Sequence, residues 1–166
     1  MLSPRQEDRP PRTASQGGFS LIELLIVVAI IGIIAAIAIP NLLASRRAAN
    51  EASAVSTVRT LSTAEETYRA TNGGGVNFTD MGGLVGNNLV DKRLGAATVV
   101  ADAKSGYIYA VTTSGGGAFY CIGTAPATAN HGTRNFSTDT PGMIYAHPLD
   151  VANPPTSTSG GVPFNN

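Results

Sequence analysis

One segment of the chain, residues 19–39, is apolar along almost its whole length. Only Ser20 and Glu23 are polar within it, and the sixteen residues from 24 to 39 are all apolar or glycine. Twenty-one helical residues span roughly 31 Å, about the thickness of the hydrocarbon core of a bilayer. Inside a soluble protein, a helix that is apolar on every face needs a shell of other elements around it. The remaining chain is too short and too polar to supply that shell, so we expect residues 19–39 to span a membrane.

The composition of the whole chain excludes several classes of protein. Its 166 residues are enough for about one domain. Eleven basic groups balance eleven acidic ones, and charged residues make up only 13% of the chain, so no specific nucleic-acid site is readable. The single cysteine, Cys121, excludes an internal disulfide and any site in which several cysteines bind a metal.

Residues 1–18 are polar and precede the apolar segment. They contain three prolines and three arginines, have no apolar run and end in Gly17 and Gly18. A segment of this composition cannot bury a core, so we interpret it as a leader or a disordered tail.

Residues 40–72 have the pattern of an amphipathic helix, with small and apolar side chains at steps of three or four. The stripe consists of Ala44, Ala48, Ala52, Val55, Val58, Leu61, Ala64 and Tyr68. Charged residues, among them Glu51 and Glu65, are expected on the other faces. Asn72-Gly73 is a typical helix end. We predict one helix over residues 19–71, kinked at Pro40 because proline lacks a backbone donor.

Residues 73–166 hold 16 of the 19 glycines and only nine charged residues. A short helix is expected within residues 79–94, weakened by its glycines. Residues 107–112 and 118–122 flank a glycine turn and predict a β-hairpin, and residues 143–146 predict a third strand. The tail from Asn153 is expected to be loose. Since so small a sheet cannot bury one face alone, we predict an α+β fold, with the long kinked helix packed against a small antiparallel β-sheet head.

The boundary between residues 1–18 and the apolar segment admits two interpretations. Ala36-Ile37-Ala38 is a small-x-small triplet after an apolar run, so a signal peptidase would cut after Ala38 and release a soluble, secreted product. Against this interpretation, Glu23 places a carboxylate near the start of the span, where it makes insertion less favourable. A segment that serves insertion alone gains nothing from that carboxylate.

Residues 18–25, GFSLIELL, and residues 27–40, VVAIIGIIAAIAIP, resemble the N-terminal signature of type IV pilins and pseudopilins. The matching positions include the glycine, phenylalanine, glutamate and proline of that signature, here Gly18, Phe19, Glu23 and Pro40. The predicted long helix and hairpin head are similar to that family in architecture.

The resemblance implies a maturation pathway. A prepilin peptidase in the membrane would cut between Gly18 and Phe19, removing residues 1–18, and would methylate the new amine of Phe19. The leader would stay in the cytoplasm, while the head would lie on the other side of the bacterial inner membrane and later on a cell-surface pilus. Counting arginines gives little independent support for this orientation, because three precede the span while Arg46 and Arg47 follow it. The implied partners are copies of the chain itself, an assembly ATPase and a platform membrane protein.

The resemblance also gives Glu23 a role in assembly between subunits, where it would pair with the terminal amine of a neighbour. Physical chemistry agrees, because a buried carboxylate needs a partner and the helix offers no cation within one turn except its own amino terminus. The alternative is a solvated Glu23 at the membrane–water boundary, mildly favoured by the helix N-terminus. Pro40 either supplies a functional kink or is tolerated where the chain leaves the bilayer, and Gly32 either permits close helix approach or is incidental.

Motifs for catalysis, cofactors or metals are not evident, so we expect no enzymatic activity and no cofactor. His131 and His147 lie in loop-like sequence without a carboxylate cluster, and no metal site is predicted. The glycine triplets lack the Lys-Ser/Thr that follows a phosphate loop. Some pseudopilins bind calcium through C-terminal loops, where this chain has Asp139 and Asp150, but the spacing of these two residues does not support such a site.

Three functions remain open at the level of sequence. The first is a structural subunit of a type IV pilus-like filament, which polymerises through residues 19–39 and displays residues 73–166. The second is a pseudopilin of a type II secretion system. The third is a monomeric binding protein that is secreted or anchored in the membrane. One cysteine cannot form the C-terminal disulfide of many type IV pilins, which leaves the subclass undecided.

Overall fold

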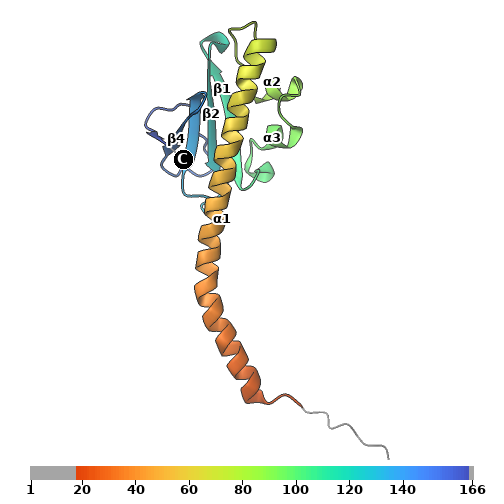
Figure 1. The fold of residues 1–166 in the computed structure, drawn as a ribbon, viewed down its shortest axis with the longest axis vertical. Helices are drawn as coiled ribbons and strands as arrows, with labels where there is room; N and C mark the ends of the chain where they lie inside the picture. The colour runs from red at the N-terminus through yellow and green to blue at the C-terminus, as the bar shows by residue number, and fades with distance from the viewer. Residues whose placement is uncertain (1–17, 165–166) are drawn as a thin grey trace, which may run out of the picture. The chain divides into compact units, whose positions relative to one another are not determined.

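The computed structural model describes residues 18–164, so all of the expected leader except Gly18 lies outside the described part. The helices are α1 (Leu21–Thr71), α2 (Met81–Gly86) and α3 (Lys92–Ala96), with short 3-10 turns η1 (Val100–Asp102) and η2 (Gly115–Gly117) (Figure 1). The strands are β1 (Tyr107–Ser114), β2 (Phe119–Pro126), β3 (Asn135–Thr140), β4 (Met143–His147) and β5 (Val162–Pro163). The chain divides into two compact units, one ending at Ile39 and the other beginning at Pro40.

The described part of the first unit, residues 18–39, is a single helical segment with no buried residue. Its helix begins at Leu21, and every residue from 18 to 39 is exposed except Ala35, which is half-buried. Leucine, isoleucine and valine residues occur along the whole segment, so in a helix their apolar side chains lie on all sides.

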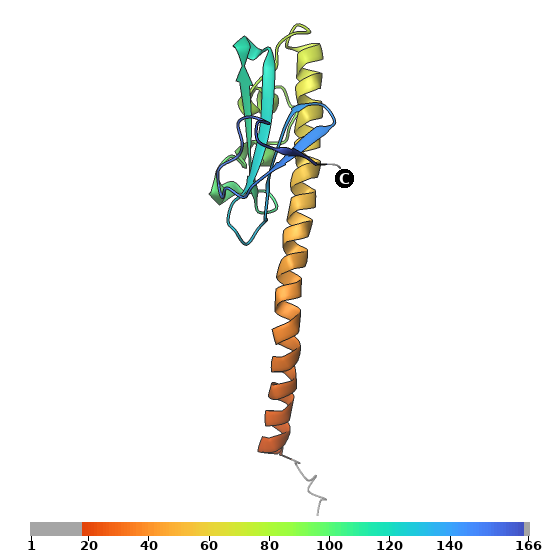
Figure 2. The same cartoon turned by 90° about the vertical axis from the view of Figure 1, so that its left-hand side faces the viewer.

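The second unit contains an antiparallel sheet with the strand order β1-β2-β3-β4-β5, so each strand pairs with its neighbour in sequence. The β1–β2 hairpin runs in register from Tyr107 opposite Pro126 to Ser114 opposite Phe119. Its turn, η2, has positive φ values at all three glycines, a conformation that side chains with a Cβ rarely adopt. Both views show the part of α1 after Pro40 running alongside the sheet (Figures 1 and 2).

The core of the second unit lies between the C-terminal part of α1, the short helices and the sheet. Helix α1 contributes Val58 and Leu61, both fully buried, and the sheet contributes Tyr109, Ile122 and Phe136. The predicted stripe therefore packs on the sheet from residue 54 onward, whereas its first three members, Ala44, Ala48 and Ala52, are exposed. The α+β prediction, with a long N-terminal helix and a small antiparallel sheet, is confirmed.

The structure differs from the predicted elements in three places. Two short helices, α2 and α3, stand where one was expected within residues 79–94, and the second extends to Ala96. Asp80 and Asp91 each cap one of them by accepting an N–H bond at 2.8 Å. Strand β3 was not predicted. The tail from Asn153, expected to be loose, pairs with β4 through β5, and the Phe164 N–H donates to the Ile144 carbonyl at 2.7 Å.

Candidate processing and assembly site

The residues at the start of the described chain are fully accessible. Phe19 is 88% exposed, and Gly18 precedes it in an irregular, exposed segment. A Cβ atom placed on Gly18 would meet nothing within 4 Å, and its backbone does not have a positive φ. The fold therefore places no demand for glycine at position 18, and the Gly18–Phe19 bond is open to another protein.

Glu23 lies in the first turn of α1. There its negative charge interacts favourably with the unpaired N–H groups of the helix N-terminus. Within residues 18–164 no cationic group lies within 4.0 Å of its carboxylate. Glu23 is thus the single carboxylate of an apolar helical segment, and it forms no ion pair with any other described residue.

The side chains that follow Glu23 form a continuous apolar surface. Leu24, Leu25 and Ile26 are 62%, 61% and 52% exposed, and as successive helical residues they point from different faces of the helix. The segment is long and apolar enough to cross a membrane, with a mean hydropathy of 3.1 in its most apolar window. Such a surface is stable only in lipid or against other apolar helices.

Pro40 lies inside α1 and begins the second unit. Since proline has no N–H group, the carbonyl oxygen of Ala36 lacks its usual partner four residues ahead. The kink predicted at Pro40 is an angle between the helical residues before and after it. This kink stays a prediction.

Two acidic residues that the helical pattern assigned to exposed faces, Glu51 and Glu65, are buried at 8% and 0% exposure. The Glu51 carboxylate accepts the N–H of Thr133 at 2.7 Å, the hydroxyl of Thr133 at 2.6 Å and the Arg134 Nη2 at 2.9 Å. Burial alone would raise the pKa of Glu51, but these Thr133 and Arg134 contacts outweigh burial and lower it. Periodicity could not reveal Glu51 because its partners lie more than eighty residues away.

Glu65 has a different environment. Its Oε2 accepts the N–H of Thr79 at 3.1 Å, while its Oε1 is buried with no partner in the described chain. Burial raises its pKa to about 7, and the nearby charges of Asp80 and Glu66 add to the effect of burial, against the opposing Thr79 bond. Through its bond to Thr79, Glu65 links the end of α1 to the segment before α2, and so it stabilises the second unit.

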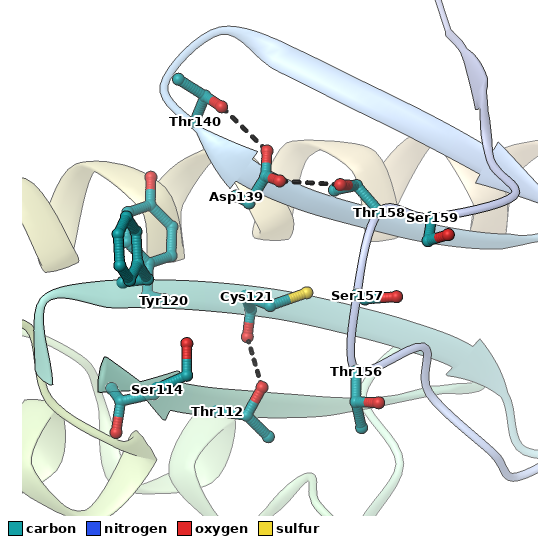
Figure 3. A pocket seen from close by; sticks show the side chains of 12 residues that line it. Thr112, Ser114, Tyr120, Cys121, Asp139, Thr140, Thr156, Ser157, Thr158 and Ser159 are labelled. Atoms are coloured by element: carbon teal, nitrogen blue, oxygen red, sulfur yellow. Dashed lines mark hydrogen bonds between the residues drawn. The ribbon is translucent and has the colours of Figure 1, made fainter. Parts of the chain in front are cut away.

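A groove of about 820 Å³ in the second unit lies between the β1–β2 hairpin, the end of β3 and residues 156–159 (Figure 3). Hydroxyl side chains line most of it, and Asp139 accepts bonds from Thr140 at 2.8 Å and Thr158 at 2.7 Å. Burial, aided by Asp139, raises the pKa of the Cys121 thiol to about 11, so this thiol is protonated at neutral pH. The groove therefore holds no activated nucleophile at Cys121.

The remaining candidate ligands are dispersed. His131 Nδ1 lies 3.0 Å from the Thr128 hydroxyl, and His147 Nε2 lies 2.6 Å from the buried Ser137 hydroxyl. Asp150 accepts the amide of Asn153 at 3.0 Å. Across residues 18–164, no group of three or more His, Cys, Asp or Glu side chains is placed to hold a metal ion.

Comparison with known proteins points to the N-terminal segment. Residues 13–39 match the family model for the prokaryotic N-terminal methylation motif. The type IV wide pilus major component PilA4 of Thermus thermophilus is 71% identical over 34 residues, which cover 20% of this chain and 26% of the relative. The type IV major pilin protein PilA of Myxococcus xanthus is 49% identical over 51 residues, covering 31% and 23% of the two chains.

A second group of relatives is named for type II secretion instead of a pilus. The type II secretion system core protein G of Escherichia coli is 37% identical over 60 residues, which cover 36% of this chain and 41% of the relative. The chain thus matches between about a quarter and two fifths of the length of these curated relatives. No solved structure matched the chain. The N-terminal segment of the chain is thus similar to those of type IV pilins and of type II secretion system core G proteins.

Proposed function

We propose that this chain is a structural subunit of a type IV pilus-like filament. The observation that carries the proposal is the first unit, an apolar helix exposed on every face with one carboxylate in its first turn. Lipid satisfies that surface before assembly, and the same segments of neighbouring subunits satisfy it in a filament. The named relatives are pilus and secretion-system components, and we propose no catalytic role.

Maturation begins at the Gly18–Phe19 bond. A prepilin peptidase cuts there and methylates the amine of Phe19. Support comes from the methylation motif over residues 13–39 and from the exposure of both residues. Glycine at position 18 has no function in the fold, so its role is in recognition by the peptidase.

Glu23 then sets the axial position of each subunit. In a bundle of these helices, the new amine of Phe19 on one subunit lies within reach of the carboxylate of another. A buried carboxylate without a partner is strongly unfavourable, so a subunit out of register is penalised. Pro40 contributes a weak point in the backbone hydrogen bonding, at which the helix bends or opens as the subunit enters the filament.

Before assembly, the subunit crosses the bacterial inner membrane once, with residues 1–18 in the cytoplasm and the second unit outside. An assembly ATPase and a platform membrane protein move it from the bilayer into the filament. These partners follow from the pilin-like N-terminal segment, since the filament grows from subunits stored in lipid.

The test is the intact mass and N-terminal sequence of protein sheared from cells. We expect a chain that begins at Phe19 and carries one added methyl group, recovered as filaments. A long-lived monomer that still carries residues 1–18, or one that begins at Ile39, would contradict the proposal. The latter terminus would indicate instead the monomeric secreted protein.

A pseudopilin of a type II secretion system is the second candidate, favoured by the match to the core protein G relatives. Both candidates share cleavage and methylation, so fractionation separates them. Recovery in sheared extracellular filaments supports the pilus, whereas retention in the cell envelope supports the secretion system.

A further inference from the structure

A small cavity of about 310 Å³ opens beside the part of α1 that follows the apolar segment. Its lining residues are Leu43, Arg46, Asn50, Ser105, Gly106, Asn130 and His131. Hydrogen-bond donors dominate this lining, and it contains no carboxylate. The cavity is therefore suited to an anionic group of modest size.

Two arginines are placed to bind such a group: Arg46 lines the cavity, and Arg47 contacts Asn130, which also lines it. Within residues 18–164, neither Arg46 nor Arg47 has a carboxylate within 4.0 Å. Arg47 Nη2 makes one long bond of 3.4 Å to the Asn130 Oδ1, and the buried Arg47 Nε has no partner in the described chain. The carboxylate of Glu51, one turn further along α1, already binds Thr133 and Arg134 instead of these arginines. An arginine fork without a partner is well matched to a phosphate.

An apolar component lies at the same cavity. Leu43 lines it and is 43% exposed, and the adjacent Leu42 is 61% exposed. These leucines precede the arginines in sequence, so apolar contact comes on the side of the chain nearer the span and basic contact follows. This order matches an amphiphile, with acyl chains ahead of a phosphate, and it does not match a free anion.

The chain also limits how far the cavity can be from the bilayer. Arg46 follows Ile39, the end of the apolar segment, by seven residues, which is about 10 Å of helical rise. The lipid headgroups extend several ångströms beyond the hydrocarbon core on each side. When residues 19–39 span the membrane, Arg46 is thus no more than about 10 Å of helix beyond the hydrocarbon core, and its long side chain can extend back toward the headgroups.

We propose that this cavity binds the headgroup phosphate of an anionic glycerophospholipid, with Arg46 and Arg47 as the charged contacts and Leu43 against the acyl chain. The proposal rests on the membrane-spanning state in the proposed function, and it does not require filament assembly. The site holds the stored subunit at a fixed depth, and the lipid must leave the site when the subunit is extracted.

The experiment uses the full chain purified in detergent and titrated with short-chain phosphatidylglycerol or phosphatidylcholine, with bound lipid counted by native mass spectrometry. We expect phosphatidylglycerol to bind at least tenfold more tightly. Arg46→Gln/Arg47→Gln should weaken phosphatidylglycerol binding roughly thirtyfold, as expected when two basic side chains leave an anionic surface. Arg46→Lys/Arg47→Lys keeps the charge and should recover only part of the affinity.

Matched controls separate a site from general charge. Arg59→Gln/Arg93→Gln removes two exposed arginines elsewhere and should leave binding unchanged. Ser105→Asp adds a carboxylate to the cavity without touching either arginine, and Asp tolerates the positive φ of this position, so binding should be lost with the fold intact. Circular dichroism and the melting temperature without lipid check the fold of each variant.

Three results would overturn the proposal: equal binding of the two lipids, an equal loss in the control pair, or retention of wild-type affinity by Ser105→Asp. Competition by glycerol 1-phosphate at the same concentration as the lipid would show a free-phosphate site and would also overturn it. Because the measurement uses single, unprocessed subunits, a failure of the chain to form filaments would leave its outcome unchanged.

Discussion

Two glutamates of α1, Glu51 and Glu65, both lie in the core of the second unit, and their surroundings give them opposite acid–base behaviour. The N–H and hydroxyl of Thr133 and the guanidinium group of Arg134 bind Glu51 and favour its charged form. Glu65 has one N–H donor, one unpartnered oxygen and two acidic neighbours, so its neutral form is favoured. Charged residues on a helix are therefore poor indicators of its exposed face when distant partners can bind them.

Glu51→Gln tests the first of these environments. Because the folded pKa of Glu51 is lowered, its carboxylate contributes stability above the ordinary value of 4.5, and the contribution is lost as the pH falls through the folded value. We expect the substitution to reduce the free energy of unfolding by about 1.5–3 kcal/mol at pH 7. Urea unfolding at pH 7 and pH 3 measures this, and the difference should shrink at pH 3. The control Glu66→Gln, which breaks only the exposed pair with Arg69, should cost less than about 1 kcal/mol.

Glu65→Gln should have the reverse effect. The folded state holds a proton on Glu65 up to about pH 7, whereas the unfolded chain releases it near 4.5, so stability falls as the pH rises across this window. Glutamine has no proton to release in this range, so the stability of the variant should not fall in the same way. Relative to the wild type, the variant should gain about 1–3 kcal/mol between pH 4.5 and pH 8 in urea unfolding. A difference that stays constant with pH would show that Glu65 does not titrate in this window.

At the scale of elements, the sequence patterns predicted the helix and the strands whose apolar residues recur regularly. The long helix and the β1–β2 hairpin follow from periodicity and from the glycines of the turn. Strand β3 escaped because its buried positions include hydroxyls instead of apolar groups, and Ser137 and Thr138 are 0% and 1% exposed. Their partners, His147 and the Met143 carbonyl, come from β4, and such pairing is invisible in a local window.

The same limit applies to the C-terminal segment and to the candidate site. The tail lacks a strand pattern, yet it passes so close to β2 that a Cβ atom on Gly123 would collide with the Pro155 carbonyl. That contact depends on the folded sheet. In contrast, Gly18, Phe19, Glu23 and Pro40 were identified from a contiguous motif, and the exposure of the first three agrees with the proposed roles without testing them. The basic cavity beside Arg46 combines three separate segments and could not be read from sequence.

Phe164→Ala tests whether the C-terminal segment stabilises the sheet. The Phe164 ring packs edge-on against Phe136 at a centroid distance of 5.3 Å, and the Arg134 guanidinium lies 5.0 Å from its centre. We expect a loss of about 1.5–3 kcal/mol, since the ring is half-buried. Relative to the wild type, amide hydrogen exchange in the variant should accelerate more in β4 and β5 than in β1. Unchanged exchange in β4 would mean that β5 does not support the sheet.

At the scale of the whole molecule, the two units divide the work of the chain. All residues of the main core cluster belong to the second unit, and none of residues 18–39 is buried. Folding and membrane association are therefore separable. The 40–166 fragment should fold with the cooperative thermal transition of the full head and remain monomeric in solution, as measured by analytical ultracentrifugation. A molten or aggregated fragment would show that residues 19–39 are needed for folding.

Glu23→Ala tests assembly through the first unit. Without the carboxylate, no ion pair fixes the register, so we expect at least a tenfold loss of sheared filaments. Processing to Phe19 and the amount of membrane-inserted subunit should be unchanged. Glu23→Gln should resemble alanine, because it keeps the size and removes the charge. Normal filament yield from either variant would reject the register role of Glu23.

Strand β5 is the last element in chain order, and it pairs with β4 at the far edge of the sheet. During synthesis the hydrophobic anchor emerges from the ribosome more than a hundred residues earlier than β5. In the membrane topology proposed above, the apolar segment therefore enters the lipid before the second unit is complete. On this proposal, folding ends only after β5 has crossed the membrane, so the unfinished chain stays tethered there, away from aggregation partners in the bulk.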